Sequence, residues 1–228
     1  LDRDAGWSNL MGALHWHHDG DEIRHRHSLF YSGYDSRINV LQDDTSADLP
    51  SYIMSGGYKG ALDWSGFTAG AEVTAYRVRL QHPEIGGLFG RPDEDVAEIQ
   101  NALETSVSLG YERTFLNVLD VSAGLRGSLY LSPESRLYHG LCPELSVSYD
   151  MSRSGVLRAA YGWKKQHIFQ TGLSNVGFPL EFWVLSGKYA DPQKCQYAEA
   201  SYEVDLFNDM LGLSVGAYWK KRYDQPRQ

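Results

Sequence analysis

Several features that would assign the chain to a common soluble or helical class are missing. Only two cysteines occur in 228 residues, Cys142 and Cys195, which is too few for a disulfide scaffold, and their spacing is not that of metal ligands. No apolar run approaches the ~18 residues of a membrane helix, since even the stretch from Leu180 to Leu185 is interrupted by Glu181. The net charge of −8 offers little attraction for phosphates, so we expect no nucleic-acid partner.

The sequence also lacks the features that would indicate a natural N-terminus, a barrel-closing C-terminus or a boundary between domains. The first residues, Leu1 to Asp4, contain neither an initiator Met nor the basic-then-apolar pattern of a signal peptide. Gln228 closely follows a strand-like stretch that has no closing aromatic residue, and no linker or low-complexity tract divides the chain. We therefore expect residues 1–228 to be a single segment excerpted from a longer chain.

A period of two dominates the sequence, above all from Pro143 to Tyr223. Between Leu157 and Lys164, one face carries Leu, Ala, Tyr and Trp, and the other carries Arg, Ala, Gly and Lys. Because successive side chains leave a pleated strand on opposite faces, this period predicts β-strands. Runs of ~9–10 residues match the length of a tilted strand that crosses a bilayer.

Alternation bounded by Gly, Pro, Asn and Asp predicts ten strands. They cover residues 7–18, 22–40, 52–64, 67–81, 98–113, 120–131, 141–150, 156–170, 192–206 and 210–223. Short turns alternate with longer loops, and the longer loops lie at 41–51, 82–95, 132–140 and 171–191. Outer-membrane barrels have short periplasmic turns and long extracellular loops. We therefore expect an all-β fold, an antiparallel up-and-down meander of about ten long strands, in preference to a Greek-key sandwich.

The same alternation predicts which side chains share a face. We expect outward-facing side chains at Leu157, Tyr161, Leu211 and Val215, and lumen-facing ones at Arg158, Lys164, Glu203 and Ser214. Aromatic residues suited to the headgroup boundary stand at the short-turn ends of the strands: Trp16, Trp64, Phe67, Phe115, Tyr149 and Phe207. The core of a soluble sheet is the alternative place for these rings.

The densest cluster of potential metal ligands is histidine-rich. His15, His17, His25 and His27 would suit zinc or copper if the strand register brought them opposite one another. A symmetric turn at Gly20-Asp21 instead sets His17 against Arg24 and His15 against Arg26. Because those pairings mix cations with the imidazoles, we expect no metal site.

Two patterns could indicate catalysis, and each has a simpler explanation. Glu199, Glu203 and Asp205 share a strand face with Ser201, which is typical of a solvated wall and lacks the apolar pocket that a glycosidase acid requires. The sequence from Gly212 to Gly216 matches Gly-x-Ser-x-Gly, but it lies inside an alternating strand and no helix pattern follows. We therefore expect no catalytic residue and no enzyme activity.

A disulfide between Cys142 and Cys195 is constrained by the predicted sheet. Each cysteine begins a strand, and one strand separates them. Strands that are next-nearest neighbours lie roughly 10 Å apart, beyond the ~7 Å Cα separation of a disulfide. A bridge would therefore require a loop excursion.

Three stretches carry a family resemblance from about Glu104 onward. They are Leu119–Arg126, Cys142–Tyr149 and, above all, Gly177–Tyr202. The last contains Phe178-Pro179-Leu180-Glu181-Phe182-Trp183-Val184 and then Asp191-Pro192-Gln193-Lys194, similar to a Leu-Pro-x-Asp-x-Trp-Val loop and a Pro-Gln strand start. Tyr218-Trp219-Lys220-Lys221 is similar to a Tyr-Tyr-Lys-Lys strand. Together they resemble the β-barrel of TonB-dependent outer-membrane receptors, especially those with a carboxypeptidase-regulatory-like domain before the plug.

The chain departs from that family at several positions. Leu185 stands where the family usually has Pro, Cys195 where it has a small or polar residue, and Glu144 where a basic residue is expected. The segment contains no plug, no TonB box and no barrel-closing strand. Because the family's barrel has about twenty-two strands, ten strands correspond to less than half of one.

The resemblance implies a transport receptor in the cell outer membrane. Its function would be TonB-energised uptake of a large or scarce nutrient, with no cofactor. Its partners would be the TonB complex, acting through the plug region that this segment lacks, together with the nutrient and outer-membrane lipid. Glycan, siderophore, cobalamin and peptide are all open as cargo. The alternative is a self-contained ten-stranded outer-membrane barrel that acts as an enzyme or an adhesin.

The longest predicted loop, residues 171–191, provides the candidate binding residues. It carries four aromatic side chains, Phe178, Phe182, Trp183 and Tyr189, which we assign to substrate binding. Aromatic side chains in a long loop can stack on sugars or rings at modest entropic cost. The alternative is that Phe182 and Trp183 attach the loop to the barrel rim.

Overall fold

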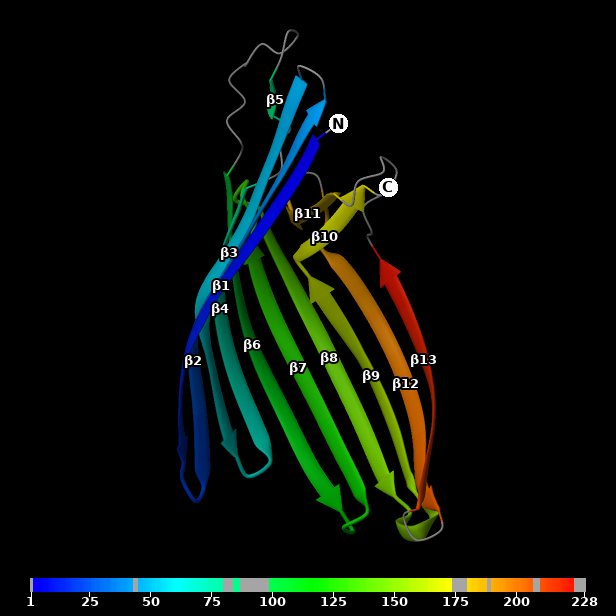
Figure 1. Cartoon of the computed structure of the whole chain (residues 1–228). Helices are drawn as coiled ribbons and strands as arrows, with labels where there is room; N and C mark the ends of the chain where they lie inside the picture. Colours follow the sequence, from blue (N-terminus) through cyan, green and yellow to red (C-terminus); the bar gives the residue numbers. More distant parts are fainter. Residues whose placement is uncertain are drawn as a thin grey trace.

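The computed structural model describes residues 2–42, 45–79, 84–86, 99–173, 180–187, 190–206 and 210–223. Ten antiparallel strands form one sheet in chain order (Figure 1). They are β1 (Asp2–Asp19), β2 (Ile23–Gln42), β3 (Thr45–Trp64), β4 (Phe67–Arg79), β6 (Ile99–Phe115), β7 (Leu119–Leu131), β8 (Leu137–Asp150), β9 (Val156–Gln166), β12 (Gln193–Leu206) and β13 (Leu211–Tyr223). The short β5 (Glu84–Gly86) pairs with β3, η1 (Ser152–Ser154) is a 3₁₀ turn, and β10 (Ile168–Leu173) and β11 (Leu180–Leu185) form a separate hairpin. Within these residues, no helix is long and apolar enough to cross a membrane.

The all-β meander and its ten strands are confirmed, but β3 is longer than predicted. It begins at Thr45, so the loop predicted at 41–51 is largely strand. In the sequence Pro50 indicates a turn, but in the structure it lies in β3 and pairs with Arg37 of β2. The ladder between β3 and β4 ends at Tyr52, so Pro50 has no β4 partner, and proline is tolerated at such an edge position.

The loop predicted at 171–191 also contains regular structure. β9 ends at Gln166, the chain leaves the main sheet at His167, and β10 begins at Ile168 and pairs with β11. The sequence alternation predicts one strand through residue 170 because periodicity reports an extended chain and not the sheet that it joins.

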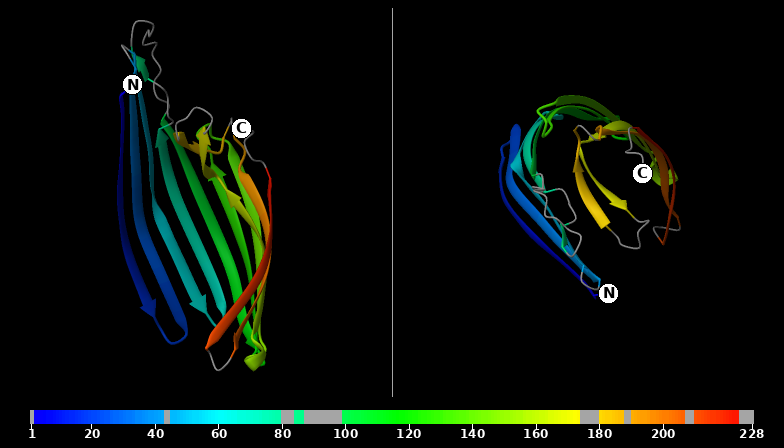
Figure 2. Two further views of the ribbon diagram at one scale, coloured as in Figure 1. Left: turned by 45° about the vertical axis from the view of Figure 1, so that its right-hand side comes forward. Right: turned by 90° about the horizontal axis from the view of Figure 1, so that it is seen from above.

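The main sheet is curved, and the β10–β11 hairpin lies inside its concave side. Figure 2 shows this arrangement from above, with β10 and β11 enclosed by the arc of the other strands. The short turns gather at one end of the sheet, and the hairpin lies at the other, which we call the hairpin end (Figure 1). In the described part of the chain, β1 pairs only with β2 and β13 only with β12, so the arc has two edges.

Each ladder keeps one register throughout, so a single residue fixes the face of all the others. Tyr130 points into the concave side, because its hydroxyl donates to the carbonyl of Ser186 beside the hairpin. Counting across the ladders places Arg158, Lys164, Glu203 and Ser214 on this concave face, as predicted. Leu157, Tyr161, Leu211 and Val215 lie on the convex face and are 45%, 43%, 51% and 61% exposed.

The convex face forms a broad apolar band. Besides the four residues above, its exposed side chains include Val107, Leu109, Leu125, Leu129, Leu141, Leu145, Leu213 and Trp219. Aromatic rings stand at the turn end, where the Trp64 and Phe67 rings stack with centroids 5.5 Å apart. A soluble monomer rarely exposes a continuous apolar surface of this extent, so the band requires an apolar partner.

The β3–β4 turn shows why the sequence closes these hairpins tightly. Ser65 and Gly66 both have positive φ, 47° and 83°, as a two-residue hairpin turn requires. A Cβ at Gly66 would lie 2.6 Å from the carbonyl oxygen of Glu112, so only glycine fits there. The turn therefore fixes the register of β3 against β4.

Adjacent residues on β13 provide a test of the two faces. In the intact protein carrying Cys142→Ser and Cys195→Ser, a bimane fluorophore is attached at Leu213→Cys or at Ser214→Cys, and the protein is reconstituted in brominated lipid. We expect several-fold stronger quenching at 213, on the convex face. Equal quenching at both positions would contradict the assignment.

Candidate functional site

The concave face carries a charged cluster across four strands, which we call the wall cluster. The carboxylate of Glu72 on β4 forms two ion pairs. One is with the ammonium group of Lys59 on β3, at 3.0 Å, and the other is with the guanidinium group of Arg126 on β7, at 3.2 Å. To reach Glu72, the Arg126 side chain crosses β6, where the small residues Ser106 and Ser108 occupy the same face. The carboxylate therefore holds two cations side by side on the wall.

A second polar group lies toward the other edge of the arc. Tyr197 of β12 donates its hydroxyl to Glu144 of β8 at 2.6 Å, and its ring lies over Gly162 of the intervening β9. A Cβ at Gly162 would lie 2.8 Å from that ring, so glycine permits the crossing. Lys164 stands over the same ring, 4.7 Å from its centroid, and Arg158 pairs with Glu203.

These ion pairs are half-exposed, so they contribute little to stability. The side chains of Arg126 and Lys59 are 48% and 54% exposed, and exposed pairs are typically worth about 0–1 kcal/mol. Their effect is to make the concave wall hydrophilic along its length. Such a wall can line a water-filled passage and offer hydrogen bonds to a polar solute.

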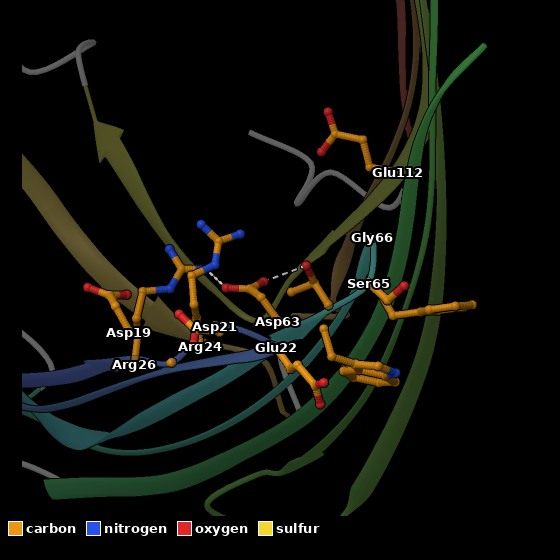
Figure 3. A pocket seen from close by; sticks show the side chains of 13 residues that line it. Asp19, Asp21, Glu22, Arg24, Arg26, Asp63, Ser65, Gly66 and Glu112 are labelled. Atoms are coloured by element: carbon orange, nitrogen blue, oxygen red, sulfur yellow. Dashed lines mark hydrogen bonds and ion pairs between the residues drawn. The ribbon is translucent and has the colours of Figure 1, made fainter.

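Figure 3 shows a pocket at the turn end of the concave face, with a volume of about 670 Å³. Asp63 accepts hydrogen bonds from Arg26 at 2.9 Å and from Thr68 at 2.7 Å. Five carboxylates and two guanidinium groups line the pocket, from Asp19, Asp21, Glu22, Asp63 and Glu112 and from Arg24 and Arg26. The excess of acid makes this end of the face electronegative.

Two tyrosines attach the hairpin to the wall, and we call them the hairpin clamp. Tyr130 of β7 donates to the carbonyl of Ser186 at 3.1 Å, and Tyr138 of β8 donates to the carbonyl of Gly187 at 3.1 Å. The contact also has an apolar part. Leu185 belongs to a buried cluster with Val78, Ala102 and Tyr130, and Trp183 packs against that cluster.

The structure describes the four aromatic residues predicted for substrate binding to different extents. Phe178 and Tyr189 lie outside the described residues. Phe182 lies in β11 opposite Thr171, and only its backbone placement is described. Trp183 is half-buried against the apolar cluster, so it at least anchors the hairpin. A role in binding stays a proposal for all four residues.

The concave site also contains residues that the sequence analysis does not predict. The wall cluster of Lys59, Glu72 and Arg126 follows from alternation once the strand register is known, but the register is not visible in the sequence. Tyr130 and Tyr138 stand directly opposite each other on β7 and β8. A signal for them was available, because both are aromatic residues at concave positions otherwise occupied mostly by small or polar side chains.

The histidine register predicted for the β1–β2 hairpin is wrong by two residues. His17 pairs with Arg26 and not Arg24, and His15 lies opposite Ser28 and hydrogen-bonds to it at 2.7 Å. The turn is centred one residue later, on Asp21 and Glu22, because the Gly20 amide donates to the Ile23 carbonyl at 3.0 Å. A shift of the turn by one residue moves every cross-strand partner by two.

This register separates the four candidate metal ligands. His15 and His17 lie on the concave face, whereas His25 and His27 lie on the convex face, where their rings contact each other and Trp16. No group of three ligands in the described part of the chain could hold a metal ion. Both cysteine thiols are free, with β9 between their strands.

An open arc of ten meandering strands, apolar outside and charged inside, is the architecture of a β-barrel wall. The sequence matches no protein-family model and no curated protein. Among solved structures, the fold is similar to that of BauA, the ferric preacinetobactin receptor from Acinetobacter baumannii, with a TM-score of 0.61 and 14% identity. The match covers 95% of this chain and 37% of BauA, and at that identity it establishes the fold alone.

Removal of one clamp hydroxyl tests the attachment of the hairpin. Tyr130→Phe deletes the bond to Ser186 and keeps the ring, so we expect hairpin docking to weaken by about 0.5–1.5 kcal/mol. Hydrogen–deuterium exchange of β10 and β11 should then become several-fold faster. Tyr149→Phe, on the convex face, is the matched control and should leave the hairpin unchanged. Unchanged exchange in Tyr130→Phe would show that the hydroxyl does not hold the hairpin.

Proposed function

We propose that this chain is part of the barrel wall of an outer-membrane receptor that imports a large or scarce nutrient with energy supplied through TonB. The observation that carries the proposal is the difference in polarity between the two faces of the sheet. Leucine, valine and tryptophan cover the convex side, whereas Lys59, Glu72, Arg126, Arg158 and Glu203 line the concave side. A lipid-embedded barrel with a hydrophilic interior requires this distribution.

The position of the β10–β11 hairpin favours a receptor function over that of an open pore. β10–β11 is held inside the arc at the hairpin end by the clamp and the apolar cluster, where it narrows the concave space. In the proposed orientation, this end is extracellular, because the short turns face the periplasm. A cargo entering the barrel would meet this hairpin before it met the wall cluster.

The self-contained barrel is less well supported. Closure of a ten-stranded barrel would require β1 to pair with β13, and in the described residues each of these strands has only one neighbour. The likeness to BauA, a receptor structure of which this chain matches 37%, also favours a wall segment of a larger barrel. An enzyme activity is also less well supported, since Glu72 and Glu203, two carboxylates of the concave wall, are each paired with a cation.

Uptake measurements test the transport proposal. The intact receptor is expressed in an outer membrane with and without a functional TonB complex, and cellular accumulation of labelled ferric siderophores, cobalamin, oligosaccharides and peptides is measured. We expect at least one cargo to accumulate in a TonB-dependent manner and at least tenfold above a host lacking the receptor. Equal accumulation of every cargo with and without TonB would contradict the proposal.

The aromatic residues of the hairpin are tested in the same assay. We expect Phe182→Ala with Trp183→Ala to reduce cargo binding at least tenfold, because both residues belong to β11, and the hairpin of β10 and β11 lies inside the arc at the hairpin end. The control pair, Trp64→Ala with Phe67→Ala, removes the same ring types at the turn end and should leave binding intact. Unchanged binding and uptake by a folded Phe182/Trp183 variant would remove these residues from the binding site.

A further inference from the structure

Four buried polar atoms gather at the base of the β10–β11 hairpin without hydrogen-bond partners among the described residues. They are both ring nitrogens of His167, Nε1 of Trp183 and the hydroxyl of Ser186. His167 is 2% exposed and Ser186 is fully buried. Buried polar groups are normally paired, so such a concentration at one contact needs a physical explanation.

His167 stands where the hairpin leaves the main sheet. Its carbonyl accepts a hydrogen bond from the Ser186 amide at 2.8 Å, which closes the base of the hairpin. Its ring stacks on the clamp residue Tyr130, with centroids 4.4 Å apart and planes inclined by only 7°. The ring therefore lies between the hairpin and the wall, and water has little access to it.

A neutral imidazole fits this position, but an imidazolium does not. A protonated ring has two N–H donors and a charge, and the described residues offer neither nitrogen an acceptor. Lys165, two residues before His167, adds a second positive charge. The clamp hydroxyls of Tyr130 and Tyr138 are directed to backbone carbonyls, and the Glu134 carboxylate lies against Gly187. Glu104 of β6 lies directly opposite Tyr130 on the same concave face.

We propose that His167 makes docking of the β10–β11 hairpin dependent on pH: the neutral ring holds the hairpin against Tyr130, and protonation releases it. The release requires no other reaction, since one proton moves from solvent to a ring nitrogen and the charged ring then moves into water. This device concerns the hairpin alone. Its consequence, a wider concave passage at acid pH, rests on the proposed transport function.

The electrostatics of the site agree with this geometry. Burial, with a smaller contribution from Lys165, lowers the pKa of His167 to about 4, from an ordinary value of 6.5. A lowered histidine pKa means that docking is fully favoured above the ordinary value and is lost as the pH falls through the lowered one. A difference of this size corresponds to release favoured on the order of 100-fold by protonation.

Hydrogen–deuterium exchange of the intact protein in lipid tests the proposal, with rates corrected for the intrinsic effect of pH. Between pH 7.5 and pH 3.5, protection of β10 and β11 should fall on the order of 100-fold, whereas protection of β7 and β8 should remain. In His167→Phe, the ring stack is retained and the proton site is absent, so protection of the hairpin should no longer depend on pH. If His167→Phe does not fold, His167→Gln removes the titration in a smaller side chain.

Three outcomes would overturn the proposal. The first is a wild-type hairpin that stays protected at pH 3.5. The second is a loss of protection that includes β7 and β8 equally, which would indicate general acid unfolding. The third is the same acid response in a folded His167 variant, which would assign the response to the nearby carboxylates Glu104 and Glu134. None of these outcomes depends on transport, so failure of the uptake assay leaves this test unaffected.

Discussion

Successive side chains leave a pleated strand on opposite faces, and every other property of this chain depends on that constraint. The ladders run without a bulge, so the face of one residue determines the face of all the others across the ten-stranded sheet. Leucine and valine at alternate positions produce the apolar convex band, and the positions between them produce the charged wall. A single slip of register would exchange the two sets along a whole strand.

The hairpin shows how a second kind of interaction is added to this framework. β10–β11 is held by two tyrosine hydroxyls, a small apolar cluster and one stacked imidazole, against an arc held by continuous backbone ladders. Because the hairpin is held by side-chain contacts, some of which leave polar atoms unpaired, it can detach from the arc without breaking the backbone ladders.

The sequence alone predicts the strands and their faces well, because each depends on local alternation. The neighbours Leu157 and Arg158, for example, lie on opposite faces as the alternation predicts. Register depends on turn geometry, which is why the position of His17 opposite Arg26 was missed by two residues. The His167–Tyr130 contact joins segments 37 residues apart, and no pattern in either segment signals it. Phe178 and Tyr189 lie outside the described residues, so their assignment rests on the sequence alone.

The central claim is that the convex band faces lipid and the sheet is part of a membrane barrel. In water, the band would have no partner, nor would the two edges that the described strands leave open, and unpaired edges associate with one another. Light scattering of the purified 228-residue chain tests this most directly, in buffer with and without detergent. The account predicts association or aggregation without detergent and dispersal with it. A stable monomer in detergent-free buffer, with open edges and no bound amphiphile, would contradict it.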